Sequence, residues 1–242
     1  MNAIDTNRTV RDWAVEVPGA TRYFEKVGID YCCGGARPLA EVCAERGIDA
    51  SVVVAALEAL ADQATPARRT DDPAAMTLTA LVDHIESTHH VFTTNELARL
   101  EALFDKVCNA HGDRRPELIE MRNVFRELSA DLLPHMGKEE QVLFPYVRAL
   151  EAAAKQYRPA PKPVFGTVRN PIRMMMMEHD AAGELLARLR ALSSDYVPPA
   201  DACVSYGTLF RALAELERDL HTHIHKENNI LFPRAATLEE GT

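Results

Sequence analysis

One sequence motif that combines histidine with glutamate occurs twice in the chain. Residues 135–145 read HMGKEEQVLFP and residues 223–233 read HIHKENNILFP, so His, Lys, Glu, Leu, Phe and Pro recur at identical offsets. Histidine precedes glutamate by four residues in both copies, which places the two side chains on one face of a helix. Imidazole and carboxylate together suit transition metals. The repeat therefore predicts a metal site whose first ligands are His135, Glu139, His223 and Glu227.

Apolar residues on the same helix faces predict that these ligands point into a core. The two stripes advance in steps of three and four residues: Phe125, Leu128, Leu132, His135, Glu139 and Val142 in one segment, and Leu209, Leu213, Leu216, Leu220, His223, Glu227 and Ile230 in the other. A carboxylate removed from water needs a compensating charge. No lysine or arginine lies on either stripe, so a metal cation is favoured, and a hydrogen-bonded network without metal is the alternative.

Another histidine precedes each motif on a separate predicted helix, His84 in LVDHIESTHH and His179 in MMEHDAAGELL. The chain thus reads as a duplicated helix pair with four histidines and two glutamates in its site. No thiolate belongs to this set, and the HExxH pattern of zinc proteases is absent, so iron or manganese is favoured over zinc. If both glutamates bridge two octahedral ions, the six ligands fill eight of about twelve positions and leave room for O2 or NO.

The remaining histidines and acidic residues near these positions are expected outside the ligand set. His89 and His90 follow His84 by five and six residues, which on an α-helix places them away from its face. At most, these two support the ligands from outside. The residues read as solvent-side histidines or surface charges are His221, His225, Glu140 and Glu178.

A second candidate site is the segment DYCCGG at residues 30–35. Adjacent cysteines do not suit the relaxed geometry of a disulfide, and the two glycines leave the backbone and sulfur atoms accessible. Cys32 and Cys33 are therefore candidates for a reactive or metal-transferring role. The alternative is a pair of thiols that fill space beneath a turn.

Long helical patterns and few strand signals predict an all-α protein. Residues 1–62 are expected to form a small helical N-terminal domain around the DYCCGG loop, and residues 77–236 an antiparallel four-helix bundle that holds the site. The breaker-rich stretches 63–76, 158–171 and 193–202 separate the segments. The four expected bundle helices are 77–110, 115–153, 171–193 and 202–236.

Composition limits the classes of function. Lys and Arg total 27 and Asp and Glu 36, so the formal net charge of −9 disfavours a nucleic-acid partner. No apolar run reaches the length of a membrane span, and the first residues lack the apolar core of a signal peptide. Five cysteines without a regular framework fit a reducing compartment. We therefore expect a cytoplasmic protein with no membrane partner.

The DYCCGG segment followed by two HxxKExxφLFP segments, where φ is Val142 or Ile230, resembles the repair-of-iron-centres family, the ScdA and YtfE group. The resemblance covers nearly the whole chain and implies a hemerythrin-like bundle that holds two iron ions with an oxo bridge. It implies terminal iron ligands at His84, His135, His179 and His223, bridging carboxylates at Glu139 and Glu227, and a functional thiol pair at Cys32 and Cys33.

The family resemblance also implies a function. It points to a stress-response protein that restores iron–sulfur clusters damaged by nitric oxide or oxidants by donating iron, with damaged iron–sulfur proteins as partners. Two alternatives remain open at this point: reduction of NO to N2O at the di-iron centre, and a module that senses O2 or NO. The sequence leaves open whether the chain forms a homodimer.

Overall fold

Helices are the regular secondary structure of the described chain. The computed structural model describes residues 8–62 and 72–241, and within these ranges the only β-type pairing is an isolated bridge between Thr9 and Pro38. The all-α prediction is confirmed. None of the described helices combines the length and the apolar character that a lipid bilayer would require of a spanning segment.

The N-terminal unit packs four short helices around one apolar cluster. Its helices are α1 (Val10–Glu16), α2 (Ala20–Val27), α3 (Leu39–Glu45) and α4 (Ala50–Asp62). Thr9 and Asp12 form a capping box at the start of α1, and Gly28, with φ of 71°, ends α2 in the left-handed conformation that glycine adopts without strain. The cluster includes the fully buried side chains of Phe24 and Leu57.

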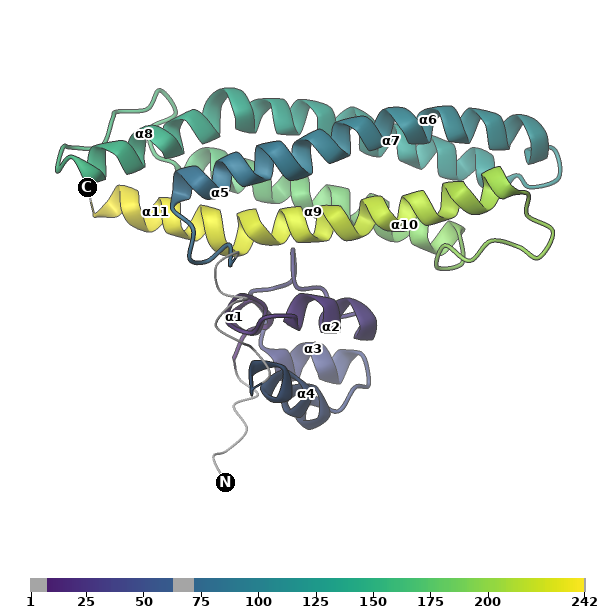
Figure 1. Ribbon diagram of the computed structural model, residues 1–242, viewed down its shortest axis with the longest axis horizontal. Coiled ribbons are helices and arrows are strands. Elements are labelled where there is room, and N and C mark those ends of the chain that lie inside the picture. The colour runs from purple at the N-terminus through teal and green to yellow at the C-terminus, as the bar shows by residue number, and fades with distance from the viewer. Residues whose placement is uncertain (1–7, 63–71, 242) are drawn as a thin grey trace.

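Four long rods make the bundle in the described residues (Figure 1). The first rod consists of α5 (Leu78–His84), the π-helix η2 (Ile85–His90) and α6 (Val91–His111). The second consists of α7 (Glu117–Lys138), the π-helix η3 (Glu139–Leu143) and α8 (Phe144–Lys155). The third is α9 (Arg169–Leu192). The fourth consists of α10 (Val204–His225), the π-helix η4 (Lys226–Leu231) and α11 (Phe232–Glu240).

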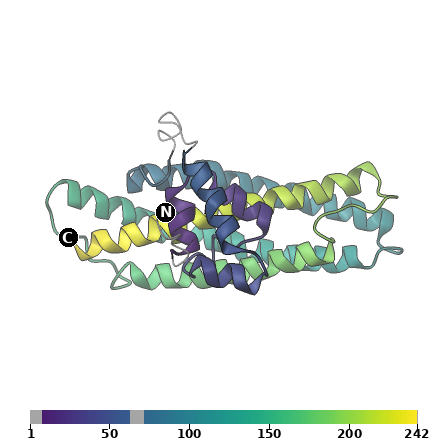
Figure 2. The same ribbon diagram turned by 90° about the horizontal axis from the view of Figure 1, so that it is seen from below.

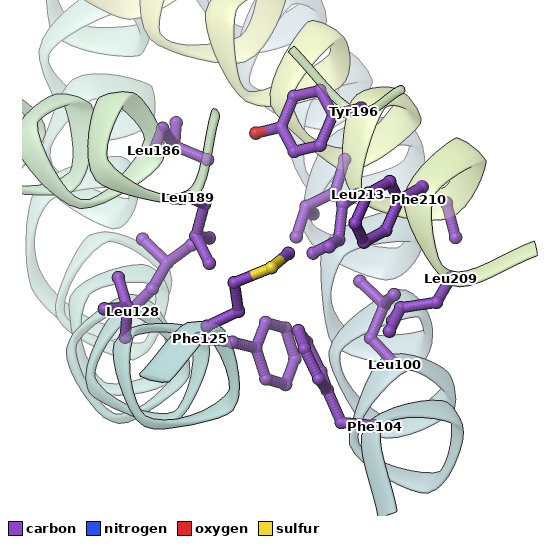
Figure 3. Close-up of a cluster of buried hydrophobic side chains, with 14 of the residues drawn as sticks. Leu100, Phe104, Phe125, Leu128, Leu186, Leu189, Tyr196, Leu209, Phe210 and Leu213 are labelled. Atoms are coloured by element: carbon purple, nitrogen blue, oxygen red, sulfur yellow. The ribbon is translucent and has the colours of Figure 1, made fainter. Parts of the chain in front are cut away.

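Two apolar clusters fill the bundle and leave a polar layer between them. Figure 3 shows one cluster, in which leucine and phenylalanine side chains of α6, α7, α9 and α10 point toward one another. The other cluster joins α5, α8 and α11 with the start of α9. Along every rod the two clusters are separated by a stretch that carries buried His or Glu side chains, for example between Leu132 and Leu143 or between Leu220 and Ile230. The candidate ligands lie in this layer.

The N-terminal unit lies against the middle of the bundle, on the side of the fourth rod (Figures 1 and 2). Ile224 of α10 belongs to the apolar cluster of the N-terminal unit. The Nδ2 atom of Asn229 donates to the carbonyl oxygen of Tyr31 over 2.8 Å, and the Tyr31 ring meets His225 edge-on. The loop that follows Tyr31 therefore faces the polar layer of the bundle.

Candidate metal centre

Six buried side chains from all four rods converge in the polar layer. They form two overlapping groups: His90, Glu139, His223 and Glu227 in one, and His135, Glu139, His179 and Glu227 in the other. Within each group the ligand atoms lie within 4.8 Å of one another. Both groups share the two glutamates, an arrangement suited to two cations that share two carboxylates.

The imidazoles meet in pairs through their Nε2 atoms. The Nε2 atoms of His135 and His179 lie 3.0 Å apart, and those of His90 and His223 lie 3.2 Å apart. Each pair faces carboxylate oxygens at short range. The distances from Nε2 to oxygen are 3.1 Å for His223 to Glu227, 3.2 Å for His179 to Glu227, 3.4 Å for His135 to Glu139 and 3.5 Å for His90 to Glu139.

Acceptors outside the centre orient these rings. The Nδ1 atom of His135 donates to Glu178 over 2.8 Å, and that of His90 donates to Glu140 over 2.7 Å. An ionised carboxylate only accepts, so the ring proton lies on Nδ1 and the Nε2 lone pair points into the centre. A carboxylate behind a histidine is the usual support of a metal ligand.

The donor set fits metal cations. Glu139 and Glu227 are fully buried, and both oxygens of Glu139 accept no hydrogen bond from the residues that the structure describes. Paired imidazole lone pairs and buried carboxylates would repel one another without positive charge between them, which either protons on the rings or a metal cation can supply. A neutral imidazole and carboxylate set without thiolate is the set that iron or manganese prefers. The hydrogen-bonded network without metal, by contrast, leaves buried oxygens unpaired.

The pKa shifts of the ligands also indicate a centre that favours a bound cation. Burial lowers the pKa of His179, but the hydrogen bond and charge of Glu227 outweigh it and raise the pKa to about 9. The pKa of His90 is likewise raised to about 9, because Glu139 and Glu227 outweigh burial. Burial opposes ionisation of Glu227, yet the charges of His223 and His179 hold its pKa well below the usual range. The centre therefore favours positive charge strongly.

The structure places five of the six predicted metal ligands together and leaves His84 outside. The Nε2 atom of His84 accepts instead from the Nζ atom of Lys226 over 2.7 Å, at the half-exposed edge of α5. His90 stands in the group where His84 was expected. The physical reason is the π-helix η2, in which residues five apart lie over one another, so His90 falls on the core face that Ile85 begins.

Sequence reasoning also missed supporting residues. Glu140 and Glu178 were expected to be surface charges, yet each accepts a hydrogen bond from the Nδ1 atom of a ligand histidine. His225 was expected on the solvent side but is buried against Tyr31. One signal for Glu140 was available in the repeat: Asn228 occupies the same offset in the second motif, and its Oδ1 atom accepts from Nδ1 of His179 over 2.9 Å.

The cysteine pair lies beside the centre as two free thiols. The Asp30 carboxylate accepts from the backbone amides of Cys32, Cys33 and Gly34 at 2.9, 3.0 and 2.8 Å, which folds the loop around that side chain. The Sγ atom of Cys33 is 3.7 Å from the carbonyl oxygen of His179. Its neighbour Cys32 is buried, and the hydrogen bond to Cys33, burial and Asp30 raise the pKa of that thiol well above its ordinary value.

Comparisons with known proteins give the family. The protein-family model described as Hemerythrin HHE cation binding domain matches residues 81–235, and the family model ScdA_N, a domain of unknown function, matches residues 6–61. A probable iron–sulfur cluster repair protein of Haemophilus influenzae is 35% identical over 222 residues, which cover 91% of this chain and 93% of that protein. The iron–sulfur cluster repair protein YtfE of Escherichia coli O81 is 34% identical, with 92% and 93% covered. The chain therefore belongs to the family of hemerythrin-like proteins with an ScdA-type N-terminal domain, that of the YtfE iron–sulfur cluster repair proteins.

Proposed function

We propose that the chain holds two iron ions and supplies iron to iron–sulfur clusters damaged by nitric oxide or oxidants. The observation that carries the proposal is the pair of overlapping ligand groups, which share two fully buried glutamates. The relatives are named iron–sulfur cluster repair proteins, and this supports both the process and the class of partner.

The ligand set of the proposal follows the geometry. His90, in place of His84, would join His135, His179 and His223 as a terminal ligand, and Glu139 and Glu227, which both groups share, would bridge the ions. An oxo bridge would add a further shared ligand. Such a set leaves about one exchangeable position per ion, which suits an ion that must leave and allows NO or O2 to bind.

The cysteine loop supplies a second element of the proposal. Cys33 lies at the backbone of a ligand residue, His179. Thiolates bind iron, and a thiol pair beside the centre is suited to receive an ion on its way to a partner. The free thiols fit a reducing cytoplasm, which we propose as the location.

Two measurements test the proposal: metal analysis of the purified protein and an assay of iron delivery to a damaged cluster. Protein purified with iron should contain about two irons per chain and give the Mössbauer spectrum of a coupled oxygen-bridged pair. Under anaerobic conditions it should restore the absorption and activity of a [4Fe–4S] protein damaged by NO, whereas the metal-free chain should not. One zinc per chain, or equal restoration by the metal-free chain, would contradict the proposal.

A further inference from the structure

The two halves of the centre are related by the internal repeat, which allows each supporting residue to be compared with its counterpart. The motif residues His135 and Lys138 correspond to His223 and Lys226. On the facing rods His179 corresponds to His90, since each pairs through Nε2 with the motif histidine of the other half. Glu178 directly precedes His179 and His89 directly precedes His90, so Glu178 and His89 are counterparts as well.

The support of the motif histidines differs between the halves. Glu178 accepts from Nδ1 of His135 over 2.8 Å and also binds the ammonium of Lys138. The Nδ1 atom of His223 is buried and has no hydrogen-bond partner within residues 8–62 and 72–241. Among the four ligand histidines in the described chain, it is the one whose Nδ1 atom is left without an acceptor.

His89 occupies the place of the missing carboxylate and cannot act as one. Its ring is stacked on His223 with an interplanar angle of 3° and a centroid distance of 5.4 Å. The Nδ1 atom of His89 donates to Asp219 over 2.9 Å, and Nε2 accepts from the Nζ atom of Lys226 over 2.6 Å. Both ring nitrogens are therefore used elsewhere, and the contact with His223 is a face contact only.

The charges near the two histidines differ as well. Lys138 is half-exposed and its charge is compensated by the carboxylate that supports His135. Lys226 is buried, and its ammonium is shared between the imidazoles of His84 and His89, with the nearest carboxylate, that of Asp219, on the far nitrogen of His89. A carboxylate behind a ligand histidine raises the donor strength of the ring, and its removal lowers metal affinity about 10-fold to 100-fold. A buried ammonium has the opposite effect on a nearby cation.

We propose that the two metal positions are held unequally, and that the ion between His90 and His223 is the one released, while the ion between His135 and His179 is retained. The inference rests on the proposed iron-donor function and names which of its two ions is the cargo. Glu178 acts as a positioning residue for the retained ion, and His89 marks the weaker half.

Release of Fe²⁺ to a ferrous chelator tests the inference without any client protein. The wild-type chain should lose its iron in two phases of about one ion each. His89→Glu, which gives His223 the support that His135 has, should slow the fast phase about 10-fold to 100-fold and leave the slow phase in place. The reciprocal variant Glu178→His should convert the slow phase into a fast one. Circular dichroism of both variants reports whether the bundle is intact.

Ligand deletion assigns the phases. The ion that remains in His223→Ala should leave slowly, and the ion that remains in His135→Ala should leave fast. A single phase in the wild type, or reciprocal variants that leave both phases unchanged, would overturn the inference. Two phases without delivery to a damaged cluster would contradict the repair function and still support unequal holding, whereas a chain that binds no iron would overturn both.

Discussion

The side chain of Asn228 joins the ligand His179 to the backbone of Cys32. Its Oδ1 atom accepts from Nδ1 of His179 over 2.9 Å, and its Nδ2 atom donates to the carbonyl oxygen of Cys32 over 3.2 Å. One amide therefore orients a candidate metal ligand and fixes the cysteine loop against the bundle. A displacement of either partner changes the hydrogen bond available to the other.

Substitution of Asn228 should weaken the centre. In Asn228→Ala the Nδ1 atom of His179 loses its acceptor, so iron affinity should fall about 10-fold to 100-fold. Competition with a chelator measures the change. The matched control is Asn229→Ala, which removes contacts to Tyr31 and His225 on the same side of the fourth rod but none to a ligand. Equal effects of the two substitutions would show that loop docking, and not support of His179, sets the affinity.

Removal of the thiols should separate iron binding from iron transfer. Neither Cys32 nor Cys33 belongs to the ligand groups, although Cys33 lies 3.7 Å from the carbonyl oxygen of His179. The double variant Cys32→Ala/Cys33→Ala should keep about two irons per chain and deliver them more slowly to a damaged cluster. Loss of bound iron would instead make the pair part of the centre. Cys43→Ala, a thiol buried in the N-terminal unit, is the control.

The two histidines of the first rod should behave differently. His90→Ala removes an Nε2 atom that faces His223 and Glu139, so iron content should fall to one ion per chain or less. His84→Ala removes only an acceptor of Lys226 and should leave about two ions. Metal analysis of both purified variants decides the assignment. Loss of iron in His84→Ala with retention in His90→Ala would restore the ligand set that the sequence predicts.

How far the sequence predicts this centre depends on helix geometry. Both motif pairs and the four rods follow from offsets that hold in any α-helix, and the DYCCGG loop follows from its adjacent cysteines and glycines. The π-helices break that regularity, because each shifts the faces by one residue. For this reason Val142, expected on the core stripe, is 45% exposed while Leu143 is buried, and His90 takes the position expected for His84. The supporting contacts of Glu178 join different rods and leave no local pattern.

Metal affinity should rise with pH. The pKa values of His90 and His179, both raised to about 9 by the neighbouring glutamates, mean that the metal-free centre binds protons at neutral pH. A metal ion must displace these protons, so each should contribute about a tenfold gain in affinity per pH unit up to about pH 9. Titration with Co²⁺ between about pH 6 and 8.5 measures the slope. A flat profile would mean that the free imidazoles are already neutral.

The carboxylate of Glu151 should stabilise the start of α5 in a pH-dependent way. It accepts from the Thr79 hydroxyl, from the ammonium of Lys155 and from the backbone amides of Thr79 and Leu78, and these bonds outweigh burial and lower its pKa. A lowered pKa contributes stability above the unfolded value near 4.5, which is lost as pH falls through the folded value. Glu151→Gln should therefore cost about 1–2 kcal/mol at pH 7 and little in acid. Urea unfolding of the metal-free chain measures this difference, with the exposed Glu127→Gln as control. If Glu151→Gln lowered the free energy of unfolding equally at both pH values, the contribution would come from the packing of the side chain and not from its charge.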